Sequence, residues 1–307
     1  MTTPSYIQVY RDLEQGSEEW LQARCGLLTA SEMKLILAVE GGGTCVKYRA
    51  TGATPAKLTP KRQQALEQIG SREGSMRDLS FVAEVSDGVL RDLLRDGALE
   101  AVQSTVPRTF RAPNDDKERS HLYELAAQRI SGYVEPTYIG DAMLRGQAEE
   151  IEARRYYEHN FAPVEEVGFI VNRQWGFAIG YSPDGLVGDE GLIEVKSRKQ
   201  SLQVQTILEH VHDRKSETIP VEFMLQCQTG LLVSERAWLD FISFSGGLPM
   251  AVIRVWPDPD LQGAIVEAAE AFEGRIAKRI ADYRAAQTFD GARLVPTERI
   301  LFTDILA

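Results

Sequence analysis

Three residues whose types could carry out hydrolytic chemistry lie near the middle of the chain: Asp184, Glu194 and Lys196. Glu194 and Lys196 are two residues apart, so in a β-strand their side chains leave the same face. Crowded carboxylates repel each other, and a divalent cation such as Mg²⁺ removes that repulsion. The pattern predicts a metal-assisted site in which the lysine orients or deprotonates the attacking water, or stabilises charge on a phosphate. A surface hairpin with a salt bridge is the alternative interpretation.

A strand pair must position these residues. The apolar runs 177–181 and 192–195 flank three glycines, which predicts a β-hairpin or closely spaced strand pair with a glycine-rich turn. We expect Asp184 at that turn, where its carboxylate can meet Glu194 and Lys196 across the pair.

Two helices are expected to bring further polar groups to the same place. In one, Glu150 shares a helical face with Ala153 and Tyr157, so its carboxylate can point inward. The segment 221–233 is predicted to form the other helix, and it carries Gln226.

The N-terminal region contains a possible phosphate-binding site. Ser17 can cap a first helix, and the segment 29–37 is predicted to form a second helix with Thr29 or Ser31 as its cap. Ser31 at a helix N-terminus with Arg24 nearby favours anion binding, and simple capping is the alternative.

Composition limits the class of protein. The chain has 307 residues, 43% of them hydrophobic, which suffices for one large domain or one domain with an insertion. It has no apolar run of membrane-spanning length and no signal-peptide pattern, so we expect a cytoplasmic protein that does not engage a membrane. Its three cysteines lie far apart, which argues against disulfides, zinc and iron–sulfur clusters.

Charge is unevenly distributed along the chain. The net charge of −11 is unfavourable for binding phosphates, but residues 41–111 hold eleven Lys plus Arg against eight Asp plus Glu, a net of +3 that leaves −14 elsewhere. A locally basic surface for DNA is therefore compatible with an acidic chain.

The same region has an organisation of its own. Three short helices are predicted at 61–69, 76–85 and 87–94, followed by two small strands within 98–111. This order resembles a winged-helix domain, in which a helix contacts DNA. We therefore expect an inserted winged-helix-like module that contacts DNA or docks a protein. The predicted boundaries are a nuclease-like domain of residues 1–49 and 113–307, and a module of residues 50–112.

The order of motifs resembles the lambda exonuclease or YqaJ-type viral recombinase family, within the PD-(D/E)xK nucleases. The matching pieces are Trp20 with Arg24 and Ser31, Gly146 with Glu150 and Arg154, Ser182-Pro183-Asp184-Gly185, Glu194-Val195-Lys196, Gln226 with Gln228, and Trp238. The resemblance implies an α/β (α+β) restriction-endonuclease-like core, with a central mixed β-sheet flanked by helices.

Residue roles also follow from the resemblance. It implies that Glu150, Asp184 and Glu194, with the carbonyl of Val195, bind Mg²⁺, for which Mn²⁺ can substitute. Lys196 would position the nucleophilic water. Gln226 would hold Lys196 or that water. The remaining pair, Arg24 and Ser31, would bind the terminal or scissile phosphate.

The family degrades duplex DNA from the 5′ end and leaves a 3′ single strand. The resemblance thus implies a phage or prophage protein in a bacterial host, with double-stranded DNA as substrate, a single-strand annealing recombinase or single-strand-binding protein as partner, and a homotrimer. The insert and Ser197-Arg198, where relatives often have Cys-Pro, leave ring assembly and polarity open.

Two other functions remain open at this stage. One is a related nuclease of other polarity or an endonuclease, although the chain lacks the cysteine quartet of Cas4-like enzymes. The other is a non-catalytic DNA-binding regulator with a nuclease-like scaffold. Comparing the digestion of linear DNA with that of closed circular DNA separates an exonuclease from an endonuclease.

Overall fold

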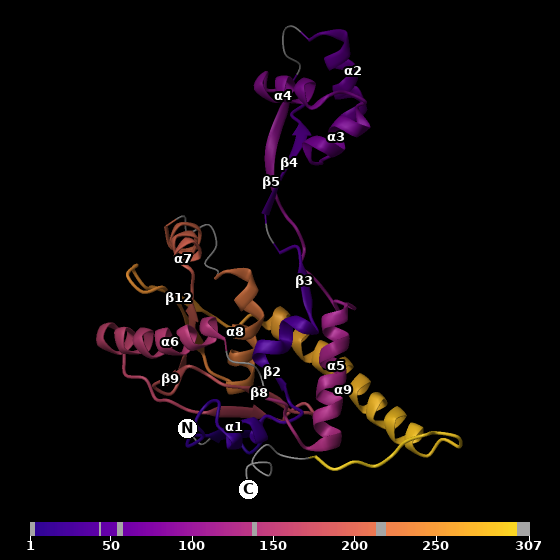
Figure 1. Cartoon of the computed structure of the whole chain (residues 1–307). Coiled ribbons are helices and arrows are strands. Elements are labelled where there is room, and N and C mark those ends of the chain that lie inside the picture. The colour runs from indigo at the N-terminus through magenta and orange to yellow at the C-terminus, as the bar shows by residue number, and fades with distance from the viewer. Residues whose placement is uncertain (1–3, 43, 54–57, 137–139, 213–218, 300–307) are drawn as a thin grey trace. The chain divides into compact units, whose positions relative to one another are not determined.

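A computed structural model describes residues 4–42, 44–53, 58–136, 140–212 and 219–299 (Figure 1). The chain forms two compact units. Residues 1–38 and 111–307 form the larger unit, and residues 39–110 form the smaller one. Among the described helices, none is both long enough and apolar enough to cross a membrane.

The first sheet of the larger unit has the order β1-β7-β8-β2. Its strands pair antiparallel except β2 with β8, which are parallel. Its strands are β1 (Ile7–Tyr10), β2 (Leu28–Thr29), β7 (Phe169–Asn172) and β8 (Ile179–Tyr181). Every residue of β7 and β8 is buried, as expected for strands inside a core.

The second sheet has the order β12-β11-β10-β9 and is mixed, because β10 and β11 are parallel while the outer pairs are antiparallel. Its strands are β9 (Gly185–Val187), β10 (Gly191–Ser197), β11 (Trp238–Phe244) and β12 (Ala251–Val255). The predicted α/β class is confirmed. The two runs expected to form one hairpin lie in different sheets, because the short strand β9 intervenes and takes the place beside β10.

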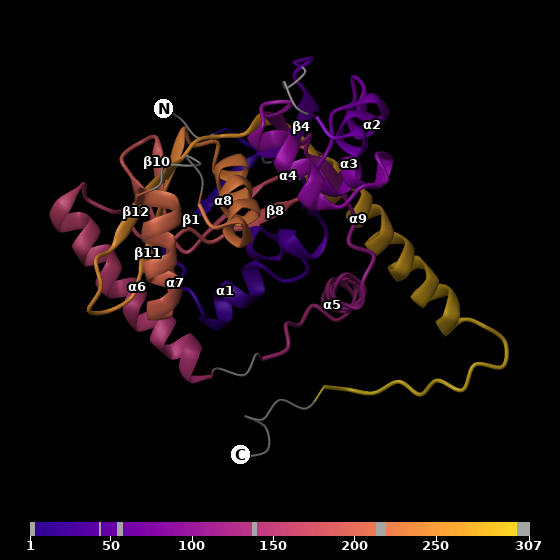
Figure 2. The same ribbon diagram turned by 90° about the horizontal axis from the view of Figure 1, so that it is seen from above.

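Helices accompany these sheets in the larger unit. Those in its described part are α1 (Glu18–Ala23), the 3₁₀ helix η1 (Ala30–Leu35), α5 (Asp116–Ser131), α6 (Asp141–Asn160), α7 (Gln200–Thr206), the π-helical η2 (Ile207–His212), α8 (Val221–Ser234) and α9 (Pro259–Gln287). Helix α5 packs against α9 and η1. Figure 2 shows α6 beside the second sheet, where Ala153 and Tyr157 are buried against Ile193 and Ile242. Helix α8 contacts both sheets and η1. The predicted helix at 29–37 is a 3₁₀ helix, with Thr29 as its N-cap.

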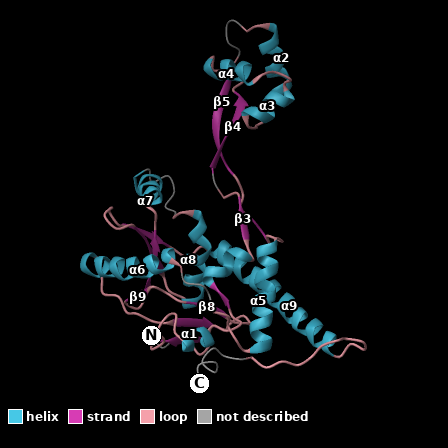
Figure 3. Ribbon diagram, in the orientation of Figure 1, coloured by secondary structure: helices cyan, strands magenta, loops and turns pink. Residues whose placement is uncertain are grey.

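Over its described residues, the smaller unit contains three helices and the antiparallel strand pair β4–β5 (Figure 3). Its elements are β4 (Thr44–Ala50), α2 (Pro60–Ile69), α3 (Met76–Val82), α4 (Asp87–Arg95) and β5 (Leu99–Thr105). Buried Leu79, Leu90 and Leu93 form its core, against which Tyr48 of β4 packs. The three predicted helices are confirmed.

The predicted wing is wrong. Strand β5 pairs with β4, and the next strand, β6 (Thr109–Arg111), pairs with β3 (Ala38–Glu40) instead of with β5. The compact unit also begins at Val39, earlier than the predicted residue 50, because β4 belongs to it. Residues 54–57 of the predicted module lie outside the described residues. Within 39–110, ten Lys plus Arg face nine Asp plus Glu, so the unit's net charge is only +1.

Candidate active site

Strand β10 places Glu194 and Lys196 on one face, as their spacing predicts. Lys196 Nζ donates to Glu194 Oε1 over 2.6 Å. The Glu194 side chain is 1% exposed and that of Lys196 is 22% exposed. The carboxylate is therefore inside the protein, while the ammonium group keeps some access to solvent.

Two further donors bind the Glu194 carboxylate. Tyr181 Oη donates to Oε2 over 2.8 Å, and Gln226 Nε2 donates to Oε1 over 2.5 Å. Gln226 was expected to hold Lys196 or water, but the structure places it on the carboxylate, since α8 presents it directly to β10. Sequence reasoning missed Tyr181, which ends the strand before Ser182-Pro183-Asp184 and gives no local signal of its role.

Asp184 lies between β8 and β9, not at the hairpin turn where it was predicted. Strand β9 pairs with β10 only as far as Ile193, so the edge of β10 beyond that residue is open on this side. The N–H of Val195 donates to Asp184 Oδ2 over 2.5 Å there. Since the N–H and C=O of one strand residue point to the same edge, the Val195 carbonyl also points to this edge of β10.

Glu150 comes from α6, whose buried face is the predicted one. Arg154, one turn later, donates to Glu150 Oε1 over 2.9 Å and also pairs with Glu166. Glu150 and Asp184 line a common cleft of about 550 Å³, together with Arg154 and Gln15. Five predicted catalytic residues, Glu150, Asp184, Glu194, Lys196 and Gln226, thus lie in one neighbourhood.

The carboxylates influence one another electrostatically. Burial, followed by the charges of Glu194 and Glu150, raises the pKa of Asp184 well above its usual value. Burial also raises the pKa of Glu150. Arg154 lowers this pKa in part, and the charge of Glu194 raises it further. Burial lowers the pKa of Lys196, but Glu194 and Asp184 outweigh it and the net shift is upward. The neighbouring carboxylates therefore favour the charged, ammonium form of Lys196.

The carboxylate oxygens of Asp and Glu are ligands that a hard divalent cation such as Mg²⁺ prefers, and a bound cation would remove the repulsion between these carboxylates. The geometry is not that of an assembled metal centre, however: across the described residues, no three His, Cys, Asp or Glu side chains are placed to hold an ion together. The Glu194 oxygens accept hydrogen bonds from Tyr181, Gln226 and Lys196. The residues present fit Mg²⁺ by type, and binding would require some of these hydrogen bonds to be exchanged for metal ligation.

The side chains of Arg24 and Ser31 both contact the hydroxyl group of Thr29. Arg24 Nη2 donates to Thr29 Oγ1 over 3.3 Å, and that hydroxyl lies 3.3 Å from Ser31 Oγ. The Arg24 guanidinium also stacks on Trp20, with its Cζ 4.4 Å from the ring centroid. Glu32 occupies the N-terminus of η1, accepting from Thr29 N and Arg24. A phosphate at this point would replace Glu32 as the partner of Arg24.

Two kinds of comparison relate this chain to known proteins. Residues 112–237 match the model of the YqaJ-like viral recombinase domain, which confirms the predicted family resemblance. The structure of an alkaline exonuclease (LHK-Exo) from Laribacter hongkongensis has a TM-score of 0.56 and 24% identity, covering 89% of this chain and 100% of that one. The structure of LHK-Exo in complex with dAMP has a TM-score of 0.55, 23% identity and the same coverage. No curated protein sequence matches significantly.

The structure match concerns the fold, and the family match concerns residues 112–237. The fold is similar to that of the alkaline exonuclease LHK-Exo. Glu150, Asp184, Glu194, Lys196 and Gln226 all lie within the matched 112–237 segment. Arg24 and Ser31 lie outside it.

Proposed function

We propose that this chain, whose residues 112–237 match the YqaJ-like viral recombinase domain, is a metal-dependent DNA exonuclease that hydrolyses phosphodiester bonds of linear duplex DNA. The observation that carries the proposal is the Glu194–Lys196 pair on β10, facing Asp184 and Glu150 across the open edge of the strand. The relative with this fold is described as an alkaline exonuclease, and one of its structures contains dAMP, a nucleoside monophosphate.

Glu150, Asp184 and Glu194, with the carbonyl of Val195, would hold Mg²⁺ or Mn²⁺. A bound ion of this kind polarises a phosphoryl oxygen and lowers the pKa of water. Lys196 supplies a fixed positive charge beside Glu194, where negative charge develops on the phosphate. Tyr181 and Gln226 fix the orientation of the Glu194 carboxylate.

The finer parts of the proposal concern polarity and partners. A phosphate seat at Arg24 and Ser31 would hold the 5′ end, which supports 5′ to 3′ degradation and release of a 3′ single strand. The family description, a viral recombinase domain, supports a role in phage-type recombination with an annealing recombinase or single-strand-binding protein. A homotrimer is the assembly proposed for tracking along DNA.

The proposal has two rivals. One is a non-catalytic DNA-binding regulator that keeps the nuclease-like fold only as a scaffold. A nuclease of other polarity, or an endonuclease, would share the site and differ in how DNA reaches it.

One experiment separates these functions. Linear duplexes with 5′-phosphate or 5′-hydroxyl ends, each strand labelled separately, are incubated with the protein in Mg²⁺, with closed circular DNA in parallel. We expect mononucleotides to be released from the 5′ end of each strand, so that a 5′-terminal label is lost before a 3′-terminal label, and the circle to stay intact. Cleavage of the circle indicates an endonuclease, and earlier loss of the 3′-terminal label reverses the polarity. Binding without cleavage in Mg²⁺ and in Mn²⁺ would establish the regulator.

A further inference from the structure

The face of β10 that carries Glu194 and Lys196 contacts α8 at three successive places. Gln226 binds Glu194. Lys196 Nζ lies 5.7 Å from the ring centroid of Phe223. Beyond Lys196, Arg198 is the next side chain that reaches α8. As β10 is followed forward the contacts run backward along α8, so helix and strand are antiparallel here.

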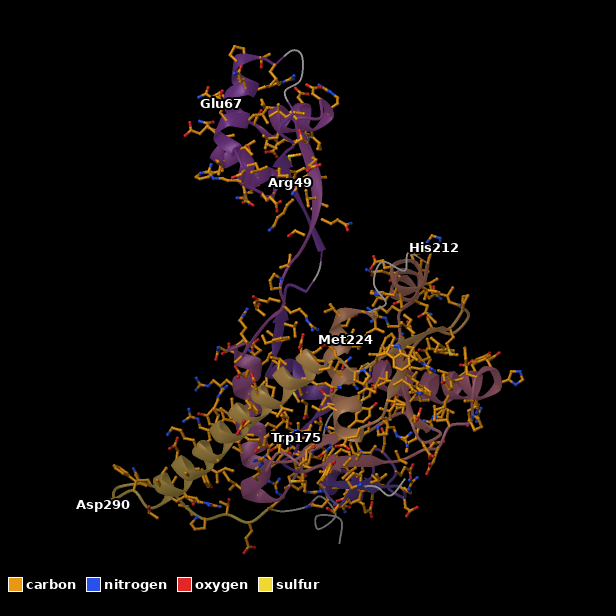
Figure 4. The ribbon with its side chains drawn as sticks, turned by 180° about the vertical axis from the view of Figure 1, so that it is seen from behind. Arg49, Glu67, Trp175, His212, Met224 and Asp290 are labelled. Carbon is orange, nitrogen blue, oxygen red and sulfur yellow. The ribbon has the colours of Figure 1, made fainter. Side chains whose placement is uncertain are left out.

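Arg198 makes two contacts with the first turn of α8. Its Nη1 donates to Glu222 Oε1 over 3.0 Å, and its Cζ lies 5.0 Å from the Phe223 ring centroid. That ring stacks on Phe241 of β11, with centroids 5.4 Å apart. Phe223 is thus held between the sheet and two cations. Figure 4 labels Met224, the next residue of this turn.

Arg198 is poorly placed to bind DNA itself. Its side chain is 8% exposed, and its backbone N–H donates to Phe244 O over 2.7 Å. Its Nε is buried and has no hydrogen-bond acceptor among the residues that the structure describes. Burying such a donor is costly, and the contacts of the other guanidinium atoms must offset that cost.

We propose that Arg198 is a positioning residue: by clamping Glu222 and Phe223, it fixes the turn of α8 that sets Lys196 and Gln226 against Glu194. Glu222 and Gln226 are four residues apart, so they lie on one face of the helix and move together. The Phe223 ring limits where the Lys196 ammonium can rest. This inference rests on the proposed nuclease function, in which Lys196 must face the reacting phosphate.

The geometry requires arginine at this position. A planar guanidinium can stack on a ring and pair with a carboxylate at the same time, whereas an ammonium group is a compact point charge without a planar face. Arg198→Lys is therefore expected to keep the attraction to Glu222 and lose the stack, and Arg198→Met to lose both while keeping most of the volume.

The test compares turnover with DNA binding. In Mg²⁺, Arg198→Met should lower kcat about 10- to 100-fold, the scale of a misplaced catalytic group, with KM nearly unchanged. Arg198→Lys should recover part of kcat. Arg173→Met, which changes an exposed arginine of the same unit, is the matched control. A rise in KM at constant kcat would overturn the proposal, because it would show a phosphate contact.

A second readout does not depend on nuclease activity. Reductive methylation of Lys196, followed by mass spectrometry on the DNA-free protein, should be several-fold faster in Arg198→Met than in the parent. If the parent cuts no DNA, the proposed function fails, and the methylation rate still decides whether Arg198 restrains Lys196. An unchanged rate overturns the proposal. Should Arg198→Met fail to fold, Phe223→Leu removes the shared ring, and the same acceleration is expected.

Discussion

Replacement of Lys196 by alanine tests the proposed chemistry directly. The ammonium group lies 2.6 Å from Glu194 Oε1 and is held as a cation by the neighbouring carboxylates. Loss of a charge that stabilises the reacting phosphate, or of its hold on water, typically lowers turnover by about 10²-fold or more. That loss corresponds to about 2.7 kcal/mol of transition-state stabilisation.

The same change affects folding less severely than the burial of Glu194 suggests. Breaking a buried ion pair costs about 3–5 kcal/mol when it leaves an isolated charge. Glu194 keeps Tyr181 and Gln226 as donors. We therefore expect the free energy of unfolding to fall by about 1.5–3 kcal/mol, the value of one hydrogen bond to a charged group. The variant should remain folded at the assay temperature.

The assay measures kcat and KM for Mg²⁺-dependent digestion of linear duplex, with urea unfolding of each protein. Lys199→Ala, at an exposed position three residues later, is the control and should leave both parameters unchanged. Full turnover of Lys196→Ala at saturating DNA, with weaker binding, would refute the reasoning by reducing Lys196 to a phosphate contact.

The metal ligands, the phosphate seat and the smaller unit each provide a further test. Asp184→Asn, or EDTA added to the parent, should abolish cleavage without unfolding the protein; a variant that still cuts at the parental rate contradicts ligation by Asp184. Arg24→Ala should remove most of any preference for 5′-phosphorylated over 5′-hydroxyl duplex, and an unchanged ratio assigns that role elsewhere. Replacing residues 41–107 by a short Gly/Ser linker, which joins β3 to β6, should leave a folded nuclease with altered DNA or partner binding. Loss of cooperative unfolding would place the unit in the core, and an unchanged salt dependence of DNA binding would leave partner docking as its role.

Local periodicity was enough to predict part of the site. The two-residue repeat of a strand places Glu194 and Lys196 on one face whatever the strand pairs with, and their 2.6 Å contact follows from it. The helical repeat likewise predicted that Glu150 shares a face with the buried Ala153 and Tyr157. The three helices of the smaller unit were also predicted from the sequence.

Strand partners were the part that local patterns could not predict. Pairing joins segments far apart in the chain, so the sequence around β5 could not show that β4, and not β6, lies beside it. For the same reason the short strand β9 was missed, and Asp184 was assigned to a turn.

The sequence by itself determined which chemical groups this protein has and which of them share a face of one element. Tertiary structure decided what those groups touch. Tyr181 reaches Glu194 from another sheet, and Arg198 reaches Phe223 on a helix whose place is set by packing against both sheets. Such contacts depend on how elements distant in sequence are packed, and this packing is a property of the whole core that no single segment encodes.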